Sequence, residues 1–367
     1  MYQSQRQARH GSRLGYALWQ SGGAVLTIAL AGCSSLNASG EGKAGEEALG
    51  VVTQATGLPP LGVIDDDASL IAAKQLVNAP PPTGLPSSVD LSASLPSPGN
   101  QLSMGSCVGW AVGYAAKSYH EVVEEGWPPS TNNHRFSASW IYNQINFGVD
   151  GRSHISDALD LMVDSGCDTL SVFPYLDGDF TTQPDARSFQ RAARFPALSW
   201  NTLAVSTTAF KNDLAAGNPI VIAISVLPDF DALNGSTNRV YDSDAGLSRG
   251  RHAVTIIGYN DVDSTFKFIN SWGTFFGNGG YGQIAYSFIT NAKLNLYAYV
   301  LHDKANLPLL GDVNGSDCVD INDYDLLSDS YNRSVASGAN PNADFNHDGW
   351  VDYLDYLTLT EHWLEGC

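Results

Sequence analysis

The chain has 367 residues, of which 43% are hydrophobic, and its 38 acidic and 19 basic residues give a formal net charge of −19. This length is enough for two or three domains with sizeable hydrophobic cores. The acidic balance argues against nucleic acid as a partner, because phosphate binding requires a basic face. The five cysteines are too few and too scattered for a disulfide framework.

Residues 1–33 have the order of an export signal. Three arginines precede a mostly apolar stretch that ends in LAGC, residues 30–33, and this order is typical of secretory signals. The ending resembles the lipoprotein box of bacteria, which implies lipidation of Cys33 and an exported protein anchored to a bacterial membrane or cell surface, or an extracellular one. A plain signal peptide or a short membrane anchor is the alternative. No other stretch approaches the roughly 18 apolar residues of a membrane span.

Residues 34–84 differ from the rest in composition. They are rich in Gly, Ala, Ser and Pro and close with NAPPPTG. Such composition predicts a linker, extended near the prolines, or a short propeptide. The stretch DDDASLIAAKQLV within it can form a short helix.

Residues 85–303 predict one globular α+β domain. Helices are expected in CVGWAVGYAAKSYHEVVEE, SASWIYNQIN and HISDALDLMVDSG. Strands are expected in PIVIAISVL, HAVTIIGYN, TFKFINSW and GGYGQIAYSF. Because the helices come first and the strands afterwards, the domain should have a helical half and a sheet half.

Four residues of this domain form a pattern suited to nucleophilic chemistry. Gln101 lies six residues before Cys107, His252 stands in RHAVTIIGYND, and Asn270 begins NSWG. A cysteine at the start of a helix is favoured as thiolate, and a histidine can share its proton. The Asn amide can orient that histidine, and the Gln side chain with the Cys107 N–H can bind a carbonyl oxygen.

These residues, their order and the NSWG motif resemble the papain-like cysteine peptidases over residues 85–301. The resemblance implies a two-lobed fold and a hydrolase that cleaves protein or peptide substrates without a cofactor. Cys107 would then be the nucleophile, with His252 and Asn270 completing a triad and Gln101 an oxyanion hole. By the same resemblance, Trp272 covers the His–Asn pair and Gly151 lines the substrate site.

Two other classes of protein remain open at this point. One is a catalytically silent peptide-binding or adhesion protein with this fold. The other is a different Cys–His acyl-transfer enzyme, such as a transglutaminase or a peptidoglycan endopeptidase. The intact set of four residues favours the peptidase over the first, and the NSWG motif favours it over the second.

The C-terminal part contains an acidic internal repeat. Residues 311–327 (GDVNGSDCVDINDYDLL) are echoed 32 residues later by ADFNHDGWVDYLDYLTL. Both copies place oxygen ligands at positions 1, 3, 5, 7, 9 and 12 of a calcium loop. The first copy supplies Asp312, Asn314, Ser316, the carbonyl of Cys318, Asp320 and Asp323, and the second supplies Asp344, Asn346, Asp348, the carbonyl of Trp350, Asp352 and Asp355.

The two loops, each followed by a helix, resemble dockerin domains. This implies a small all-α domain over residues 309–367 that binds structural Ca²⁺ and docks to a cohesin-bearing scaffold protein. The positions used for cohesin recognition carry Ile321–Asn322 and Tyr353–Leu354 instead of the usual Ser-Thr pair. An acidic solvated tail is the alternative. Whether Cys318 pairs with Cys367 is left open.

Overall fold

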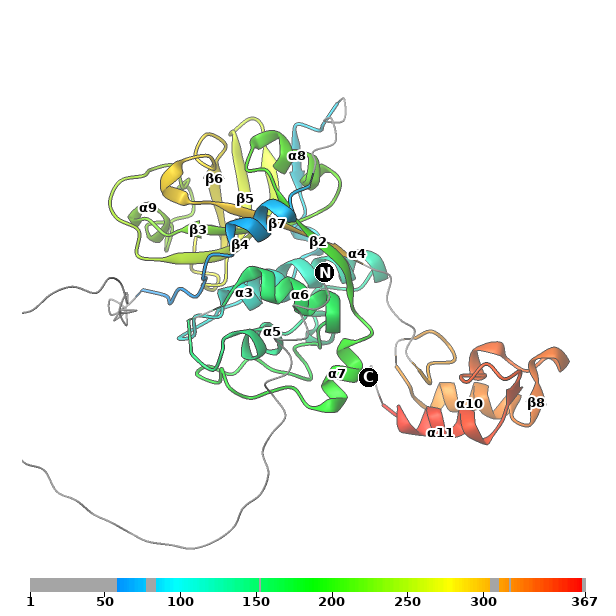
Figure 1. The fold of residues 1–367 in the computed structure, drawn as a ribbon. Helices are drawn as coiled ribbons and strands as arrows, with labels where there is room; N and C mark the ends of the chain where they lie inside the picture. Colours follow the sequence, from blue (N-terminus) through cyan, green and yellow to red (C-terminus); the bar gives the residue numbers. More distant parts are fainter. Residues whose placement is uncertain (1–57, 77–83, 152, 304–309, 317, 365–367) are drawn as a thin grey trace, which may run out of the picture. The chain divides into compact units, whose positions relative to one another are not determined.

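The computed structural model describes residues 58–76, 84–151, 153–303, 310–316 and 318–364 (Figure 1). The expected signal sequence with Cys33 lies outside these residues, as do Arg152 and Cys367. Among the residues described, no helix is long and apolar enough to cross a membrane.

The helical half of the domain is built on one buried helix that starts at Cys107. It consists of α3 (Cys107–Gly109), η2 (Trp110–Lys117), which is wound as a π-helix, and α4 (Ser118–Glu125). Small residues on most sides let α5 (Ala138–Ile145) and α6 (Ile155–Ser165) pack closely against it. These are the three helices that the sequence predicts.

Local sequence explains where these helices begin and end. The Ser137 side chain accepts the N–H of Trp140 and so caps α5. Gly166 ends α6 in a conformation with φ of 73°, which costs little only for glycine. The helical half buries its own core, which includes Val108, Trp140 and Leu159.

The second half of the domain is an antiparallel sheet with the strand order β2-β7-β3-β4-β5-β6, to which β1 adds by pairing with β4. Figure 1 shows α3, α5 and α6 grouped on one side and β3 to β6 on the other. The α+β architecture predicted from the sequence is thus confirmed. The strands are β1 (Ser88–Asp90), β2 (Ala197–Leu203), β3 (Ile220–Ser225), β4 (Arg251–Asn260), β5 (Thr265–Ile269), β6 (Tyr281–Ala285) and β7 (Tyr297–Asp303).

The remaining elements of the domain are short. β2 and β7 pair with each other and have no counterpart among the predicted strands. The α8 helix packs on β3 and β4. These elements are α7 (Ala186–Ala192), α8 (Thr207–Ala215), α9 (Pro228–Asp231), η1 (Ser92–Ser94), η3 (Asn132–His134) and η4 (Ala292–Leu294).

Residues 58–76, which the composition assigns to a linker or short propeptide, pack against this domain. Asp67 caps the short helix α2 (Ala68–Ala73), which forms within the stretch where the sequence allows one. Leu70 and Ile71 of α2 pack on the helical core. Residues 58–66 precede this helix and are called the strap below.

The C-terminal repeat forms two similar loop–helix units. Helices α10 (Ile321–Ser330) and α11 (Tyr353–Glu361) each begin with a capping box, made by Asp320 with Asp323 and by Asp352 with Asp355. The unit predicted as all-α also contains a pair of two-residue strands, β8 (Arg333–Ser334) and β9 (Trp350–Val351), because the second loop runs antiparallel to the segment after α10. Short turns are η5 (Val335–Ser337) and η6 (Pro341–Ala343).

Candidate active site

Cys107 is the first residue of α3 and is completely buried. Ser106, at the N-cap, makes no side-chain capping bond, so it leaves the first N–H groups of the helix uncapped. The positive end of the helix dipole therefore lies at the thiol. The sequence predicts this placement of the cysteine.

His252 and Asn270 come together because their strands are paired. His252 is the second residue of β4, Asn270 directly follows β5, and the register places Thr255 opposite Ile269. The His252 Nε2 lies 2.8 Å from the Asn270 Oδ1, which also accepts the Ser271 N–H. Since Oδ1 is an acceptor, Nε2 carries the hydrogen. The Nδ1 atom of His252 is buried without a hydrogen-bond partner and is left for another group.

Trp272 covers this pair. Its ring centroid lies 4.8 Å from that of His252 at an interplanar angle of 33°, and the side chain is nearly buried. Phe230 contacts both rings edge-on. The imidazole is therefore held in an apolar environment that excludes water.

Three atoms of Gln101 form hydrogen bonds that fix the position of this residue. Its backbone N–H donates to the Ser271 carbonyl over 2.8 Å, and its Oε1 accepts from the Ser271 hydroxyl over 2.6 Å. Its Nε2 donates to the Met104 carbonyl and to the Pro60 carbonyl, each over 2.9 Å. The amide is thus oriented by the protein and presents a donor to a carbonyl oxygen.

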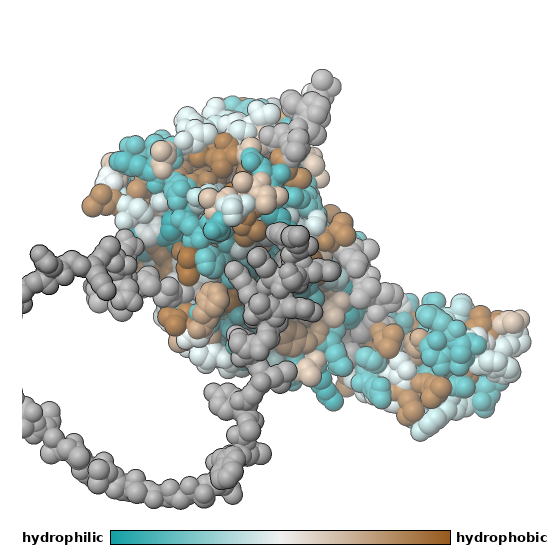
Figure 2. Space-filling model, in the orientation of Figure 1, coloured by the Kyte–Doolittle hydropathy of each residue, from teal (hydrophilic) through white to brown (hydrophobic). Residues whose placement is uncertain are grey.

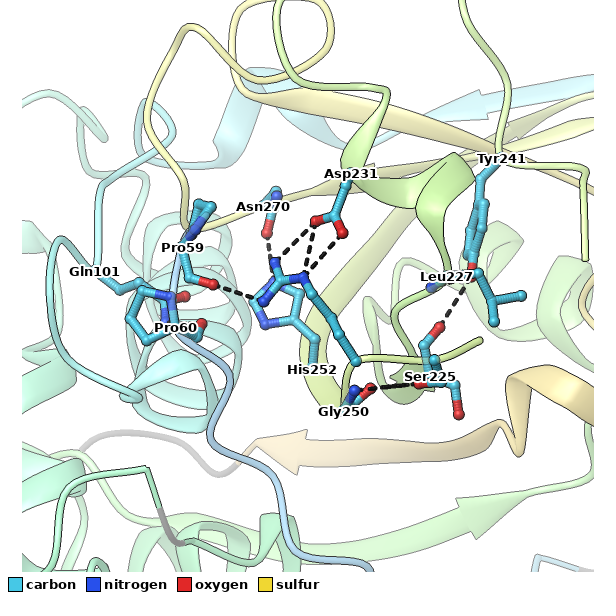
Figure 3. Close-up of polar contacts among 12 residues, drawn as sticks. Pro59, Pro60, Gln101, Ser225, Leu227, Asp231, Tyr241, Gly250, His252 and Asn270 are labelled. Atoms are coloured by element: carbon cyan, nitrogen blue, oxygen red, sulfur yellow. Dashed lines mark hydrogen bonds and ion pairs between the residues drawn. The ribbon is translucent and has the colours of Figure 1, made fainter. Parts of the chain in front are cut away.

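That carbonyl belongs to the strap, which covers the site. Figure 3 shows Pro59, Pro60 and Gln101 together beside His252 and Asn270. Gly62 approaches Gly105 so closely that a Cβ on Gly62 would lie 1.6 Å from the Gly105 carbonyl oxygen. Gly151, with φ of 81°, also lies against the strap, because a Cβ there would be 3.3 Å from the Leu61 carbonyl oxygen.

Burial favours the neutral forms of both Cys107 and His252. It raises the pKa of the Cys107 thiol from 9.0 to about 11, and it lowers the pKa of His252 from 6.5 to about 3. The backbone of Gly62 and Ala253 partly opposes the shift of the thiol, and the Asn270 hydrogen bond partly opposes that of the imidazole. The sequence predicts a thiolate at a helix start, but in this covered form desolvation outweighs the helix dipole.

Two arginines close to His252 in the sequence were not predicted as site residues. Arg249 forms an ion pair with Asp231, lies 5.4 Å from the centroid of the Trp272 ring, and donates from Nη1 to the Pro59 carbonyl over 2.8 Å. Arg251 binds Asp65 of the strap. The one signal in the sequence is the spacing RGRH, which does not by itself show what either side chain contacts.

The loops of the C-terminal repeat fit a calcium ion by their chemistry. Asp323 and Asp355, at position 12, are fully buried carboxylates that accept backbone N–H groups from the start of their own loops, Val313 and Asn314 in one and Phe345 and Asn346 in the other. Gly349, at position 6 of the second loop, has φ of 90°, as a sharp turn requires. The oxygen donors suit Ca²⁺, although no three His, Cys, Asp or Glu side chains gather into a metal-binding group in the described part of the chain.

The remaining cysteines differ in state. Cys318, in the first loop, is disulfide-bonded, and Cys367 lies outside the described residues. Cys167 is free and buried, and its thiol lies 3.7 Å from the Ser137 carbonyl. Cys167 is therefore part of the packed interior of the domain.

A helix-borne cysteine, a His–Asn pair from adjacent strands and an oriented Gln amide are the parts of a cysteine protease. Residues 85–300 match the family described as papain family cysteine protease, and the chain belongs to that family. Residues 310–364 match the dockerin type I domain, a calcium-binding module. The protein thus combines a cysteine protease domain, which is a hydrolase, with a dockerin domain.

Relatives and solved structures agree with this assignment. An uncharacterized peptidase C1-like protein of Acanthamoeba polyphaga mimivirus is 23% identical over 236 residues, which cover 59% of this chain and 73% of that protein. Fruit bromelain of Ananas comosus is 29% identical over 151 residues, which cover 38% of this chain and only 39% of bromelain. Xylellain, a cysteine protease from Xylella fastidiosa, matches with a TM-score of 0.57 and 23% identity over 66% of this chain and 95% of its own. At that identity the structural match concerns the fold.

Proposed function

We propose that the protein is an exported cysteine peptidase in which Cys107, His252 and Asn270 form the triad and Gln101 the oxyanion hole. The observation that carries the proposal is the His252 Nε2–Asn270 Oδ1 hydrogen bond of 2.8 Å. It holds the imidazole in the tautomer whose Nδ1 lone pair is free to take a proton. Trp272 keeps water from that hydrogen bond.

The mechanism follows from these positions. The Nδ1 of His252 takes the thiol proton, and the Sγ of Cys107 attacks the substrate carbonyl carbon. The oxygen, now negatively charged, accepts hydrogen bonds from the Gln101 Nε2 and the Cys107 N–H. His252 then gives its proton to the leaving amine. Water, deprotonated by the same imidazole, hydrolyses the thioester and restores the thiol.

The strap makes this form of the chain latent, in line with a short propeptide within residues 34–84. Its Pro60 carbonyl occupies the Gln101 donor, and Cys107 and His252 are completely buried. A substrate carbonyl needs the same donor, so the strap and a substrate exclude each other. The strap must therefore move or be removed before cleavage.

Two attachments complete the proposal. Cys33 within LAGC would carry a lipid and hold the protein at a bacterial membrane or cell surface. The dockerin domain would dock to a cohesin-bearing scaffold protein when its loops hold Ca²⁺. Exposed apolar residues at the recognition positions support docking: Ile321, Tyr353 and Leu354 are 57%, 58% and 55% exposed. On the face in view in Figure 2, hydrophobic residues lie among hydrophilic ones on this domain.

Cleavage of a mixed peptide library, with the products identified by mass spectrometry, tests the enzymatic part. The wild-type chain should cleave peptides after the strap is displaced, and Cys107→Ala should abolish cleavage. Peptide binding without cleavage by the wild type would favour the silent binding protein. Incorporation of an added amine in place of water would favour a transglutaminase-type enzyme.

A further inference from the structure

The strap shows how an extended peptide lies against the protein beside Cys107. The backbone of Ser153 bonds to it twice: its N–H donates to the Gly62 carbonyl over 3.0 Å, and its carbonyl accepts the Ile64 N–H over 2.9 Å. These are main-chain contacts, which any peptide can make regardless of its sequence. Side-chain contacts next to them are therefore the ones that discriminate between peptides.

The next residue of the strap, Asp65, lies in a site built for a carboxylate. The Nε and Nη2 of Arg251 both lie 2.7 Å from its Oδ1, and the Nδ2 of Asn295 donates to its Oδ2 over 3.0 Å. Both carboxylate oxygens are thus bound by side chains of the protease domain. Such charge-assisted hydrogen bonds are stronger than neutral ones.

Arg251 is held in place by groups that do not belong to the strap. Its Nη1 donates to the Leu294 carbonyl over 2.8 Å and to the Ser225 hydroxyl over 3.3 Å, and its side chain is only 14% exposed. Among the residues that the structure describes, Asp65 is the one carboxylate that forms an ion pair with Arg251. When the strap leaves, the guanidinium loses its counter-charge while Leu294 and Ser225 still hold it in place. The vacated position therefore favours an anion.

The direction of the strap indicates which part of a substrate would lie beside Arg251. His252 protonates the leaving amine, so the leaving group lies on the side of His252 and Trp272. Arg249, which lies over Trp272, binds the Pro59 carbonyl, so the N-terminal end of the strap is on this side. A substrate's leaving group is its C-terminal part, so a substrate runs opposite to the strap, and Arg251 faces residues that precede the scissile bond.

The number of strap residues between Gly62 and Asp65 indicates which substrate residue would lie beside Arg251. Gly62 is the strap residue whose backbone influences the Cys107 thiol. Asp65 is three residues further on, and an extended chain covers roughly 3.3 Å per residue. Its carboxylate therefore corresponds to a side chain of the third or fourth residue before the scissile bond.

We propose that Arg251 and Asn295 form a carboxylate-binding subsite, which selects peptides with Asp or Glu at the third or fourth position before the scissile bond. Asp65 fills this subsite in the latent chain, and an acidic side chain of the substrate fills it after the strap has moved. The proposal rests on the proposed peptidase function for the direction of the substrate.

Peptide binding to an inactive chain tests the subsite without cleavage. The full chain carries Cys107→Ser, Gly62→Ala and Asp65→Asn, so that the strap is displaced from Gly105 and no longer offers a carboxylate. Fluorescent peptides in matched pairs, with Asp or Asn at the third or fourth position, are titrated by anisotropy. One Asp peptide should bind about tenfold tighter than its Asn partner.

Further substitutions test whether Arg251 and Asn295 cause the preference for the Asp peptide. Arg251→Gln should remove it, and Asn295→Gly should weaken it while keeping the left-handed backbone, which has φ of 42° at Asn295. Arg239→Gln, at an arginine paired with Asp229 instead, should leave the preference unchanged. Equal binding of Asp and Asn peptides would overturn the proposal. Failure of every peptide to bind would also overturn it, since the site is then closed to substrates.

The two proposals fail in different ways. If the Asp65→Asn chain with an intact Cys107 cleaves Asp and Asn peptides at equal rates, the subsite is wrong and the peptidase function stands. If the inactive chain prefers acidic peptides but the intact one cleaves none, the subsite stands and the peptidase function is wrong.

Discussion

Gln101 is oriented before any substrate is present, because Ser271 holds its Oε1 and Met104 accepts one of its Nε2 hydrogens. A donor fixed in this way does not have to reorganise when negative charge develops on a carbonyl oxygen. Its second Nε2 hydrogen bonds to Pro60 in the covered form. The Gln101 amide is therefore a hydrogen-bond donor that is preorganised for a carbonyl oxygen.

Replacing Gln101 by Glu should lower kcat about 100-fold and change KM little, because the new side chain keeps its shape but has no N–H to donate. Steady-state kinetics on a cleavable peptide measure both constants. Ser103→Ala, in the same loop, removes an exposed hydroxyl bonded to Asp177 and should leave both unchanged. A Gln101→Glu enzyme with the wild-type kcat would contradict the oxyanion role.

The opposite pKa shifts of Cys107 and His252 make the covered form depend on pH. Burial holds the pKa of His252 at about 3, and uncovering the site moves this pKa upward toward 6.5, so covering loses stability as pH falls below 6.5. Burial raises the pKa of the thiol from 9.0 to about 11, and uncovering the site moves this pKa downward, so covering also loses stability as pH rises above 9. Between these limits the strap should be held most firmly.

Hydrogen exchange of the Ile64 and Ser153 amides, corrected for their intrinsic rates, measures this directly. Both amides bond across the strap and should be better protected at pH 7.5 than at pH 5. His252→Gln should remove most of the difference, since it takes away the group that titrates in that range. Equal protection at both pH values in the wild type would show that His252 is not coupled to the strap.

Glycine residues allow the strap to pass close to the protease domain. Gly62 fits against the Gly105 carbonyl, and Gly105 and Gly250 in turn lie against Leu61 of the strap, because a Cβ at either would come within 3.0 Å of a Leu61 atom. Glycine is needed here for close approach. Any side chain at position 62 must push the strap out of the site.

Gly62→Ala should therefore raise the basal peptidase activity of the full chain, by about tenfold or more if the latent form predominates. The test is initial cleavage rate against active-site concentration, titrated with a covalent thiol inhibitor. Leu58→Ala, at the exposed start of the strap, is the matched control and should stay latent. An unchanged rate for Gly62→Ala would mean that the strap does not limit activity.

The molecule as a whole consists of a protease domain and a dockerin domain with separate cores. Val319, Leu327, Val351 and Leu359 belong to the small core of the dockerin domain, and the buried carboxylates of Asp323 and Asp355 lie beside it. Because a core of this size contributes little stability, bound metal should be needed to hold the domain folded.

Calcium should thus raise the unfolding temperature of the dockerin domain and leave that of the protease domain unchanged. Calorimetry of the full chain with Ca²⁺ and then with a chelator resolves the two transitions. Asp355→Ala should abolish most of the calcium effect, whereas Asp325→Ala, outside the ligand positions, should not. Identical transitions with and without Ca²⁺ would exclude a calcium-dependent domain.

The sequence predicts those parts of the protein that depend on neighbours along the chain. The helices that start at Cys107, Ala138 and Ile155 follow from local periodicity, and the calcium loops follow from ligands within 12 residues of one another. The strands β2 and β7 were missed, because their pairing with each other is a long-range contact rather than a local pattern.

The candidate site likewise has a part that the sequence predicts and a part that only the structure shows. Cys107, His252, Asn270 and Gln101 are recognisable from residue type and order, because nucleophilic chemistry restricts which side chains can serve. The covering strap and the bond between Arg251 and Asp65, which are 186 residues apart, have no local signal. The sequence alone therefore determined the chemical groups and the two domains, and only the tertiary structure decided that these groups are buried, neutral and covered, since burial and charge pairing depend on residues brought together by folding.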